Sequence, residues 1–348
     1  MTLAQRLHAR IVADGPITVR DFMDAALYDA DEGYYSKGPR IGGEGADFYT
    51  ASNVSLFPNA LGRFVKAAVE RMGGVARVVE LGAGEGDLAK RLGFEITVVE
   101  VSAGLAKKQE AMGLQVVRGL DELREAPTIF IANEVLDALP VHRVVMAVSG
   151  LRELYVDASF REVEGALSPA LDTAARRLAW LPIGARAEVN LAARELLVAM
   201  ARAGPKSLAL FLDYGARQSE RLYGEHAMDG TLRGFRAHKV TPPLERPGEQ
   251  DITADVDFSW IATLAAEAGY ASAGIMLQGE FLADLGLVDD LQAALARGDM
   301  QAYLAGKNLL MPTGMGERFQ ALLLARDVHA DPPLPGFRKD IYPGASRR

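Results

Sequence analysis

The sequence predicts an α/β protein built around a doubly wound parallel sheet. From residue 77 onward, short runs rich in β-branched residues alternate with segments of helical periodicity. Such runs suit strands that are buried on both faces of a parallel sheet, and strict strand–helix alternation is typical of the doubly wound arrangement. A glycine-rich turn, ELGAGEG (80–86), follows the first of these strands and indicates a ligand at that edge of the sheet.

Residues 1–76 are predicted to form a helical N-terminal addition. Three of its segments carry apolar residues at helical spacing. The first ends at Asp14-Gly15-Pro16, which terminates helices, and the second begins at Thr18 with Asp21 three residues on. The predicted helices lie before Asp14, at 19–29 and at 56–72.

A glycine- and aromatic-rich stretch, residues 33–52, separates the second and third helices. A loop this long inside a compact domain is often functional. We expect residues 37–52 to fold over a bound ligand as a lid. Its apolar cover would come from Tyr34, Tyr35 and Tyr49.

Residues 77–348 are predicted to form the main domain. Its first strands are RVVEL (77–81), ITVVE (96–100), LQVVR (114–118) and TIFIAN (128–133), separated by helices at 86–92, 102–112 and 119–125. The rhythm breaks at about 141–189, where a hairpin around Ser149-Gly150 begins an inserted subdomain. The sheet is then completed by a helix at 191–203, a strand at 207–215, a helix near 257–268 and strands near 271–277 and 319–325.

Composition excludes several classes of function. The formal net charge of −8 over 348 residues argues against a protein that coats nucleic acid. The absence of cysteine excludes disulfides, thiolate catalysis and cysteine-ligated metals. No window approaches the about 20 consecutive apolar residues of a membrane helix. The N-terminus is amphipathic and basic, as mitochondrial presequences are, but it runs directly into patterned sequence, so we expect a cytoplasmic protein.

The glycine turn and two carboxylates suggest which ligand is bound. Gly82, Gly84 and Gly86 let the backbone approach a ligand closely, and the helix that follows directs free N–H groups toward it. Glu100, at the end of the second strand, can accept hydrogen bonds from a ribose diol. Glu80 would face an ammonium group and would repel a pyrophosphate. The pattern favours S-adenosylmethionine over NAD, although a tight structural turn and a solvated Glu100 remain open.

Asn133, Glu134 and Asp137 follow the fourth strand, in ANEVLDALPVHR (132–143). Since open α/β sheets bind ligands at the carboxyl ends of their strands, we expect all three in the same crevice. Asn133 would contact the cofactor, whereas Glu134 and Asp137 would act on the second substrate. The structural alternative is that Asp137 begins a helix and Asn133 is a turn residue.

Several segments, in the order in which they occur along the chain, resemble the MidA-like family of methyltransferases. They are GADFYTASNVSLFPNALGRF (45–64), ELGAGEG, ANEVLDALPVHR, LDYG (212–215), GTLRGFRAHKV (230–240) and PGEQDITADVDF (247–258). The resemblance implies a class I methyltransferase fold that uses S-adenosylmethionine. It also implies that Glu80 and the three glycines form the cofactor turn and that Glu100 binds the ribose. The family usually reads TSPEIS where this chain has residues 50–55, TASNVS, so a role of that loop in substrate selection is not carried over.

Mitochondrial members of the family methylate an arginine on a subunit of respiratory complex I. The resemblance therefore implies a protein partner, namely a respiratory-chain subunit. A guanidinium has a pKa above about 12 and must lose a proton as it attacks the methyl group. We expect the carboxylates of Glu134 and Asp137 to orient it.

Further polar residues lie in segments that end near the predicted crevice. Asp213 and Tyr214 end another strand, so we expect them to reach the crevice from one side. His238 is a candidate proton acceptor. The acids at 251–257 match no calcium loop, and we expect Thr253 or Asp255 to cap the helix that follows.

Three other functions remain open from the sequence alone. The chain could methylate a small molecule or another kind of protein side chain. It could use the glycine turn for NAD in an oxidoreductase, although Glu80 and the Asn133–Asp137 element argue against this. It could also be an assembly chaperone that binds S-adenosylmethionine without catalysis, in which case Glu134 and Asp137 would tolerate substitution.

Overall fold

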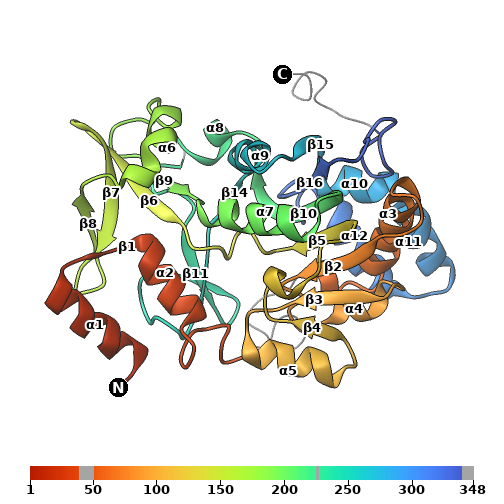
Figure 1. The fold of residues 1–348 in the computed structure, drawn as a ribbon, viewed down its shortest axis with the longest axis horizontal. Coiled ribbons are helices and arrows are strands. Elements are labelled where there is room, and N and C mark those ends of the chain that lie inside the picture. The colour runs from red at the N-terminus through yellow and green to blue at the C-terminus, as the bar shows by residue number, and fades with distance from the viewer. Residues whose placement is uncertain (39–50, 225–226, 339–348) are drawn as a thin grey trace.

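The computed structural model describes residues 1–38, 51–224 and 227–338. Within these ranges the largest unit is an eight-stranded sheet, here called the main sheet, with the order β15-β16-β10-β5-β2-β3-β4 and the short β14 beside β10 (Figure 1). Its strands are β2 (Arg77–Leu81), β3 (Ile96–Val99), β4 (Gln115–Val117), β5 (Thr128–Asn133), β10 (Ser207–Ala216), β14 (Val256–Asp257), β15 (Ala271–Leu277) and β16 (Phe319–Arg326). The strands from β10 to β4 pair in parallel, and β16 runs antiparallel to both its neighbours. The predicted doubly wound sheet is confirmed, with one antiparallel strand, β16, between β10 and the edge strand β15.

Side chains of the central strands alternate between two hydrophobic cores. In β2 and β5, Val78 and Ile131 belong to the first core, whereas Val79 and Phe130 belong to the second. The first core is covered by α3 (Phe57–Arg71), α4 (Asp87–Arg91), α10 (Gln278–Asp284), α11 (Leu287–Ala296) and α12 (Met300–Leu310). The second is covered by α6 (Asp172–Arg177), α7 (Ala192–Ala203), α8 (Ser219–Leu222) and α9 (Phe258–Glu267). Helix α5 (Ala103–Ala111) connects β3 to β4.

A second, antiparallel sheet occupies the region where the sequence predicts an insertion. This insertion sheet consists of β1 (Ile17–Thr18), β6 (His142–Ala147), β7 (Gly150–Val156), β8 (Glu162–Gly165) and β9 (Arg186–Val189). Through β1, which pairs with β7, the N-terminal helices α1 (Leu3–Asp14) and α2 (Val19–Tyr28) join it and share its core. A small sheet of β11 (Arg233–Arg236), β12 (Lys239–Thr241) and β13 (Asp251–Thr253) completes this side of the molecule.

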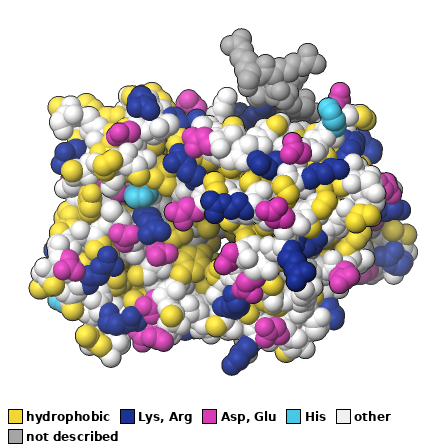
Figure 2. All heavy atoms as spheres, in the orientation of Figure 1, with side chains coloured by type: hydrophobic (Ala, Val, Ile, Leu, Met, Phe, Trp, Pro, Cys, Tyr) yellow, Lys and Arg dark blue, Asp and Glu magenta, His cyan; other side chains and the backbone are white. Residues whose placement is uncertain are grey.

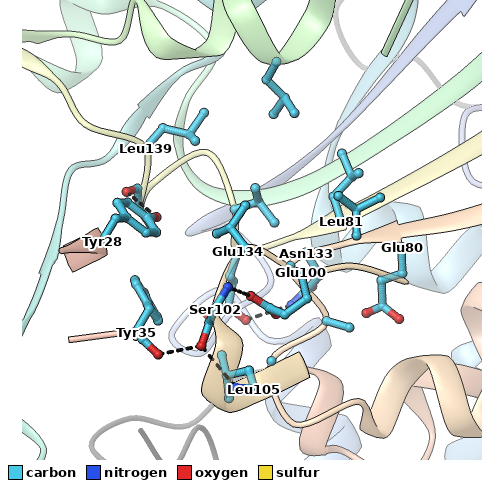
Figure 3. A pocket seen from close by; sticks show the side chains of 18 of the residues that line it. Tyr28, Tyr35, Glu80, Leu81, Glu100, Ser102, Leu105, Asn133, Glu134 and Leu139 are labelled. Carbon is cyan, nitrogen blue, oxygen red and sulfur yellow. Dashed lines mark hydrogen bonds between the residues drawn. The ribbon is translucent and has the colours of Figure 1, made fainter. Parts of the chain in front are cut away.

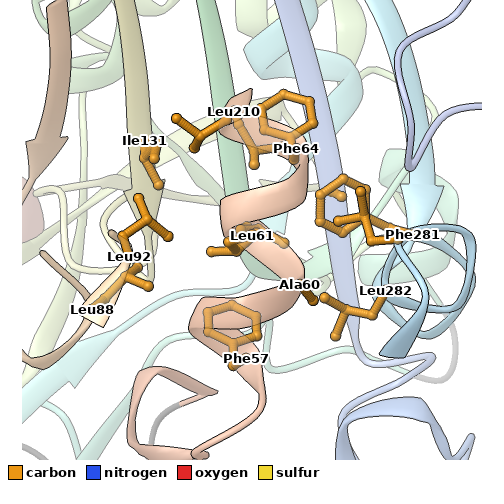
Figure 4. Close-up of a cluster of buried hydrophobic side chains, with 14 of the residues drawn as sticks. Phe57, Ala60, Leu61, Phe64, Leu88, Leu92, Ile131, Leu210, Phe281 and Leu282 are labelled. Atoms are coloured by element: carbon orange, nitrogen blue, oxygen red, sulfur yellow. The ribbon is translucent and has the colours of Figure 1, made fainter. Parts of the chain in front are cut away.

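Packing divides the first 76 residues differently from the predicted N-terminal addition. Helices α1 and α2 pack with the insertion sheet, but α3 packs on the main sheet. The reason is the apolar face of α3: Figure 4 shows Leu61 and Phe64 between the strand residues Ile131 and Leu210 and the side chain of Phe281. The rings of Phe64 and Phe281 lie 5.9 Å apart in an edge-on arrangement.

Three local details also differ from the expectations. The segment 119–125 forms one 3₁₀ turn, η2 (Leu120–Glu122), because Pro127 follows closely and stops a longer helix. The cap of α9 is Asp257, whose carboxylate accepts from the Trp260 N–H at 3.1 Å, and not Thr253 or Asp255. The helices α10–α12 have no counterpart in the prediction.

The two other short turns are η1 (Ala51–Asn53) and η3 (Pro169–Leu171). In the described ranges, every helix is too short or too polar to cross a membrane.

We predict that Phe64→Ala lowers the free energy of unfolding by about 3–5 kcal/mol, because it opens a cavity between α3 and the main sheet. Phe64 is fully buried. Urea titration measures the loss. The control is Val75→Ala, at a side chain that is 79% exposed, where a change within about 0.5 kcal/mol is expected. Equal losses in the two variants would contradict the packing described here.

Candidate functional site

A cavity of about 490 Å³ opens at the carboxyl ends of β2, β3 and β5. Its walls include the glycine turn after β2, the residues after β3, the loop after β5 and the helices α2 and α7. Tyr35, Ser36 and Ser52 complete the lining. Figure 2 shows the surface hollowed between the insertion sheet and the main sheet, with hydrophobic side chains inside the hollow. Figure 3 shows Tyr28 and Tyr35 on one side of the cavity and Glu80, Glu100 and Glu134 across from them.

The glycine turn needs the conformational freedom of glycine. Gly82, Gly84 and Gly86 have φ angles of 59°, 56° and 87°, in the left-handed region. A Cβ atom on Gly82 would lie 3.2 Å from Cγ2 of Val135, in the facing loop. Gly82 and Gly84 line the cavity, whereas Gly86 is the N-cap of α4 and lies outside the lining. The turn therefore presents bare backbone to the cavity.

Glu80 is a buried carboxylate with unused hydrogen-bonding capacity. It is 3% exposed and lines the cavity. Burial raises its pKa to about 8, although a backbone N–H bond from Ala89 partly opposes the shift. Its Oε2 atom has no hydrogen-bond partner among the described residues. A buried orphan oxygen of this kind fits an ammonium group of a ligand.

Glu100 is held at the end of β3 by two donors. Its Oε1 accepts from the backbone N–H of Ser102 at 2.9 Å, and its Oε2 accepts from Nε2 of Gln109 at 3.1 Å. Burial is the main reason that its pKa is raised. Gln109 also donates to the carbonyl oxygen of Gly84 at 2.8 Å, so it ties the glycine turn to Glu100. Each carboxylate oxygen keeps a lone pair that a ribose hydroxyl could use.

Glu134 lines the cavity in a strained conformation. Its φ is 55°, although it is not glycine, and such a residue costs about 1–3 kcal/mol and persists only where its surroundings enforce it. Its Oε1 accepts from Nδ2 of Asn133 at 3.1 Å and from the backbone N–H of Ala51 at 3.3 Å. Burial, together with the nearby charge of Asp137, raises its pKa to about 8. Strain and a raised pKa at one carboxylate are typical of functional sites.

Neither Asp137, in the loop that follows β5, nor Asp213, in β10, belongs to the cavity lining. Asp137 is 6% exposed and accepts a hydrogen bond from the hydroxyl of Tyr214. Burial is the largest cause that raises its pKa, to about 6. Asp213 is 1% exposed, and its carboxylate accepts from backbone N–H groups of the loop. The expectation that Asp213 and Tyr214 reach the crevice is therefore wrong, because both side chains point into the loop that covers them.

The structure does not bring His238 to the cavity. It is exposed, with a φ of 61°, in the turn between β11 and β12. The acids at 251–257 are likewise engaged elsewhere: Asp251 accepts from the hydroxyl of Tyr35 at 2.9 Å, and Asp255 pairs with Arg233. The described part of the chain holds no group of three His, Asp or Glu side chains placed to bind a metal ion.

Some cavity residues were not predicted. Arg20, Asp24 and Tyr28 of α2 line the cavity, as does Glu195 of α7. The signal was present in the sequence, since three polar residues four positions apart share one face of a helix. Tyr28 is fixed by a hydrogen bond from its hydroxyl to the Ala138 carbonyl oxygen (3.0 Å) and by stacking on Tyr35, 5.6 Å between ring centres.

Most of the predicted lid, residues 37–52, lies outside the described residues. The part that lies outside is 39–50, which includes Tyr49. Of the other two tyrosines expected to cover the ligand, Tyr35 lines the cavity, and Tyr34 is 5% exposed and belongs to the core between α2 and the insertion sheet. Ser52 also lines the cavity.

Comparison with known proteins yields one family and several relatives. Residues 60–276 match the family described as "Putative S-adenosyl-L-methionine-dependent methyltransferase". The chain is 30% identical to "Protein arginine methyltransferase NDUFAF7, mitochondrial" of Rattus norvegicus, over 94% of this chain and 85% of that protein. It is 28% identical to the protein of the same name from Danio rerio, over 92% and 86%.

Two solved structures from Burkholderia thailandensis are similar over nearly the whole chain. One, a COG1565 superfamily member bound to S-adenosyl-homocysteine, has a TM-score of 0.85 and 32% identity, covering 97% of this chain and 95% of the other. The second, of the same superfamily, has a TM-score of 0.84 and 30% identity, covering 97% and 94%.

The relatives correct the predicted location. The matched proteins of Danio rerio, Drosophila melanogaster and Rattus norvegicus are all named mitochondrial, which contradicts the expected cytoplasmic location. That expectation was drawn from an N-terminal segment that folds as α1. A helix that packs into the fold carries no information about the compartment.

We predict that Gly82→Ala lowers the affinity for S-adenosylhomocysteine at least about tenfold, because the added Cβ strains the turn and meets Val135. Calorimetric titration measures the affinity. Gly93→Ala is the matched control, since Gly93 also has a left-handed φ (82°) but an added Cβ there meets nothing within 4 Å. Unchanged affinity in Gly82→Ala would show that the turn does not approach this ligand.

We also predict that the affinity for S-adenosylhomocysteine rises between pH 6 and pH 8. Burial raises the pKa of Glu80 to about 8, so below pH 8 the carboxyl group is mostly protonated. An ammonium group favours the charged form, so binding must release that proton, and the affinity gains up to about tenfold per pH unit. Titration in two buffers of different ionisation enthalpy measures the release. Glu80→Gln should bind weakly and lose this dependence; a slope that survives the substitution would assign it to another group.

Proposed function

This chain belongs to the S-adenosyl-L-methionine-dependent methyltransferase family whose model it matches over residues 60–276, and we propose that it methylates an arginine side chain of a protein. Its cofactor is S-adenosylmethionine, as predicted; this excludes the alternative of an NAD-dependent oxidoreductase. The arginine acceptor is supported by relatives named protein arginine methyltransferase, at 28–30% identity. By the family resemblance, the proposed partner is a respiratory-chain subunit.

One observation carries the choice of a cationic acceptor: the strained carboxylate Glu134 lines the cavity at the end of β5. Asp24 of α2 and Glu195 of α7 also line the cavity, and Arg20 is the one basic side chain in its described lining. A guanidinium can donate paired N–H bonds to a carboxylate. Acidic walls therefore favour such an acceptor over an anionic one.

The cavity residues divide into two proposed groups. On the cofactor side, Glu80 would hold the ammonium group, the backbone of Gly82 and Gly84 would lie against the amino-acid part, and Glu100 would hold the ribose. Asn133 stands between the two groups and donates to Glu134. S-adenosylmethionine, when bound, supplies an electrophilic methyl group.

On the acceptor side, Glu134 is proposed to orient the guanidinium and to take up its proton. The acceptor arrives charged and must be deprotonated as its nitrogen attacks. A carboxylate whose pKa is about 8 is a better proton acceptor than an ordinary glutamate. Asp137, in the same loop as Glu134, helps to raise that pKa through its charge. The exposed His238 has no part in this proposal.

Labelling in a lysate tests the acceptor. The purified chain is incubated with methyl-labelled S-adenosylmethionine and a lysate of cells that lack it, and the labelled protein is hydrolysed for amino-acid analysis. The expected result is label in one or a few proteins, as methylarginine. Label in another amino acid or in a small molecule would reject the arginine acceptor. An absence of transfer would favour a cofactor-binding assembly chaperone.

We predict that Glu134→Gln leaves the affinity for S-adenosylhomocysteine within about threefold and lowers the rate of methyl transfer at least about 100-fold, since the amide cannot accept the proton. In the wild type, the rate should rise with pH up to about 8, where Glu134 becomes charged. Initial rates with the labelled acceptor measure both effects. Glu164→Gln, at an exposed carboxylate of β8, is the control. Equal loss of binding and transfer would remove Glu134 from the acceptor side.

A further inference from the structure

Three consecutive residues of β10 hold the loop that carries Glu134. The backbone N–H of Glu134 donates to the Leu212 carbonyl oxygen at 2.8 Å. The hydroxyl of Tyr214 donates to the carboxylate of Asp137. Between them, the carboxylate of Asp213 faces the backbone of the same loop. We call these contacts the β10 clamp.

Asp213 makes most of the contacts of the β10 clamp. Its Oδ2 accepts from the backbone N–H groups of Val135, Leu136 and Asp137, at 3.2, 2.9 and 3.3 Å. Its Oδ1 accepts from the N–H of Tyr214 at 3.0 Å. One buried carboxylate thus satisfies three successive donors of an irregular turn, and backbone donors are scarcely ever left unpaired when buried.

Other elements fix the carbonyl groups of this loop. Nδ2 of Asn190 donates to the Leu136 oxygen at 2.9 Å, and the Ala254 N–H donates to the Asp137 oxygen at 3.0 Å. The hydroxyl of Tyr28 donates to the Ala138 oxygen at 3.0 Å. The loop is therefore held from both sides, and the clamp is the part next to the strained residue.

We propose that Asp213 is a positioning residue for methyl transfer, which acts by holding Glu134 in its left-handed conformation with the carboxylate toward the cavity. This inference rests on the proposed role of Glu134. Asp213 itself touches neither ligand, since it lies behind the loop and off the cavity wall. Its effect must pass through the N–H groups of residues 135–137, which directly follow Glu134 in the chain.

Sinefungin tests this without knowledge of the acceptor. In this analogue a protonated amine stands where the cofactor carries its reactive methyl group, so a well-placed Glu134 carboxylate should bind it, whereas S-adenosylhomocysteine has no such amine. Calorimetry gives the two affinities, and their ratio reports the placement of Glu134. We expect Glu134→Gln to lower the sinefungin affinity about tenfold and to leave that for S-adenosylhomocysteine within about twofold.

The double variant separates positioning from a general loss of structure or charge. Asp213→Asn keeps the shape but replaces one of the two accepting oxygens by an NH2 group, which cannot accept from a backbone N–H. It should lower the sinefungin affinity about three- to tenfold. If Asp213 acts through Glu134, Asp213→Asn in the Glu134→Gln background should lower it no further. If the two substitutions lower the sinefungin affinity by factors that multiply in the double variant, the proposal is overturned. An unchanged sinefungin affinity in Asp213→Asn alone would also overturn it.

Two further variants guard the interpretation. Asp284→Asn makes the same chemical change at a carboxylate that accepts from backbone N–H groups away from the cavity, Gly336 at 2.7 Å and Arg338 at 3.4 Å; it should leave the ratio unchanged. If Asp213→Asn does not fold, as thermal melting would show, Tyr214→Phe removes a single hydroxyl from the clamp and should lower the ratio about two- to threefold, again only when Glu134 is present.

The outcomes distinguish this inference from the proposed function. Suppose that Asp213→Asn lowers the sinefungin affinity only when Glu134 is present, but that no methylarginine forms in the lysate. Asp213 would then remain a positioning residue, and the arginine acceptor would be rejected. Suppose instead that methylarginine forms, but that Asp213→Asn and Glu134→Gln lower the sinefungin affinity independently. The proposed function would then stand, and the role of Asp213 would be rejected. If Glu134→Gln leaves the ratio unchanged, Glu134 does not face the transferred methyl group, and the positioning role fails with it.

Discussion

The parallel pairing of β5 with β2 on one side and β10 on the other is the constraint on which the cavity depends. Leu81 stands opposite Ala132, and Leu212 stands opposite Asn133. Because the strands run in the same direction, the turns that leave them emerge at one edge of the sheet. The glycine turn, the loop with Glu134 and the clamp from β10 are therefore neighbours, although they come from residues about 130 positions apart in the chain.

Burial of carboxylates at this edge links the fold to the chemistry. Glu80 and Glu134 have few donors, so burial raises the pKa of each to about 8. Burial also raises the pKa of Asp213, but its carboxylate accepts from four backbone N–H groups and thereby holds the loop. The buried Oε2 of Glu80 has no donor among the described residues and lines the cavity, so it can accept from a ligand.

The second half of the cavity wall depends on a long-range contact. β1 pairs with β7, which brings α2 beside the loop after β5 and allows Tyr28 to donate to Ala138. The N-terminal helices and the insertion sheet thus form one side of the cavity together.

The sequence alone determined the parallel sheet, the glycine turn and the set of polar residues at the strand ends, because strand periodicity and left-handed glycine positions are local properties. As candidates for contact with a ligand, the sequence could rank neither Glu134 above Asp137 nor Glu80 above Asp213. All four residues follow or end strands that reach the same edge of the sheet. Only the tertiary structure decided that Asp137 meets the hydroxyl of Tyr214, that Asp213 faces the backbone of a loop, that His238 is on an exposed hairpin and that α2 lines the cavity. The physical reason is that hydrogen-bond partners and burial come from segments distant in sequence, and these decide which carboxylate is satisfied and which is free.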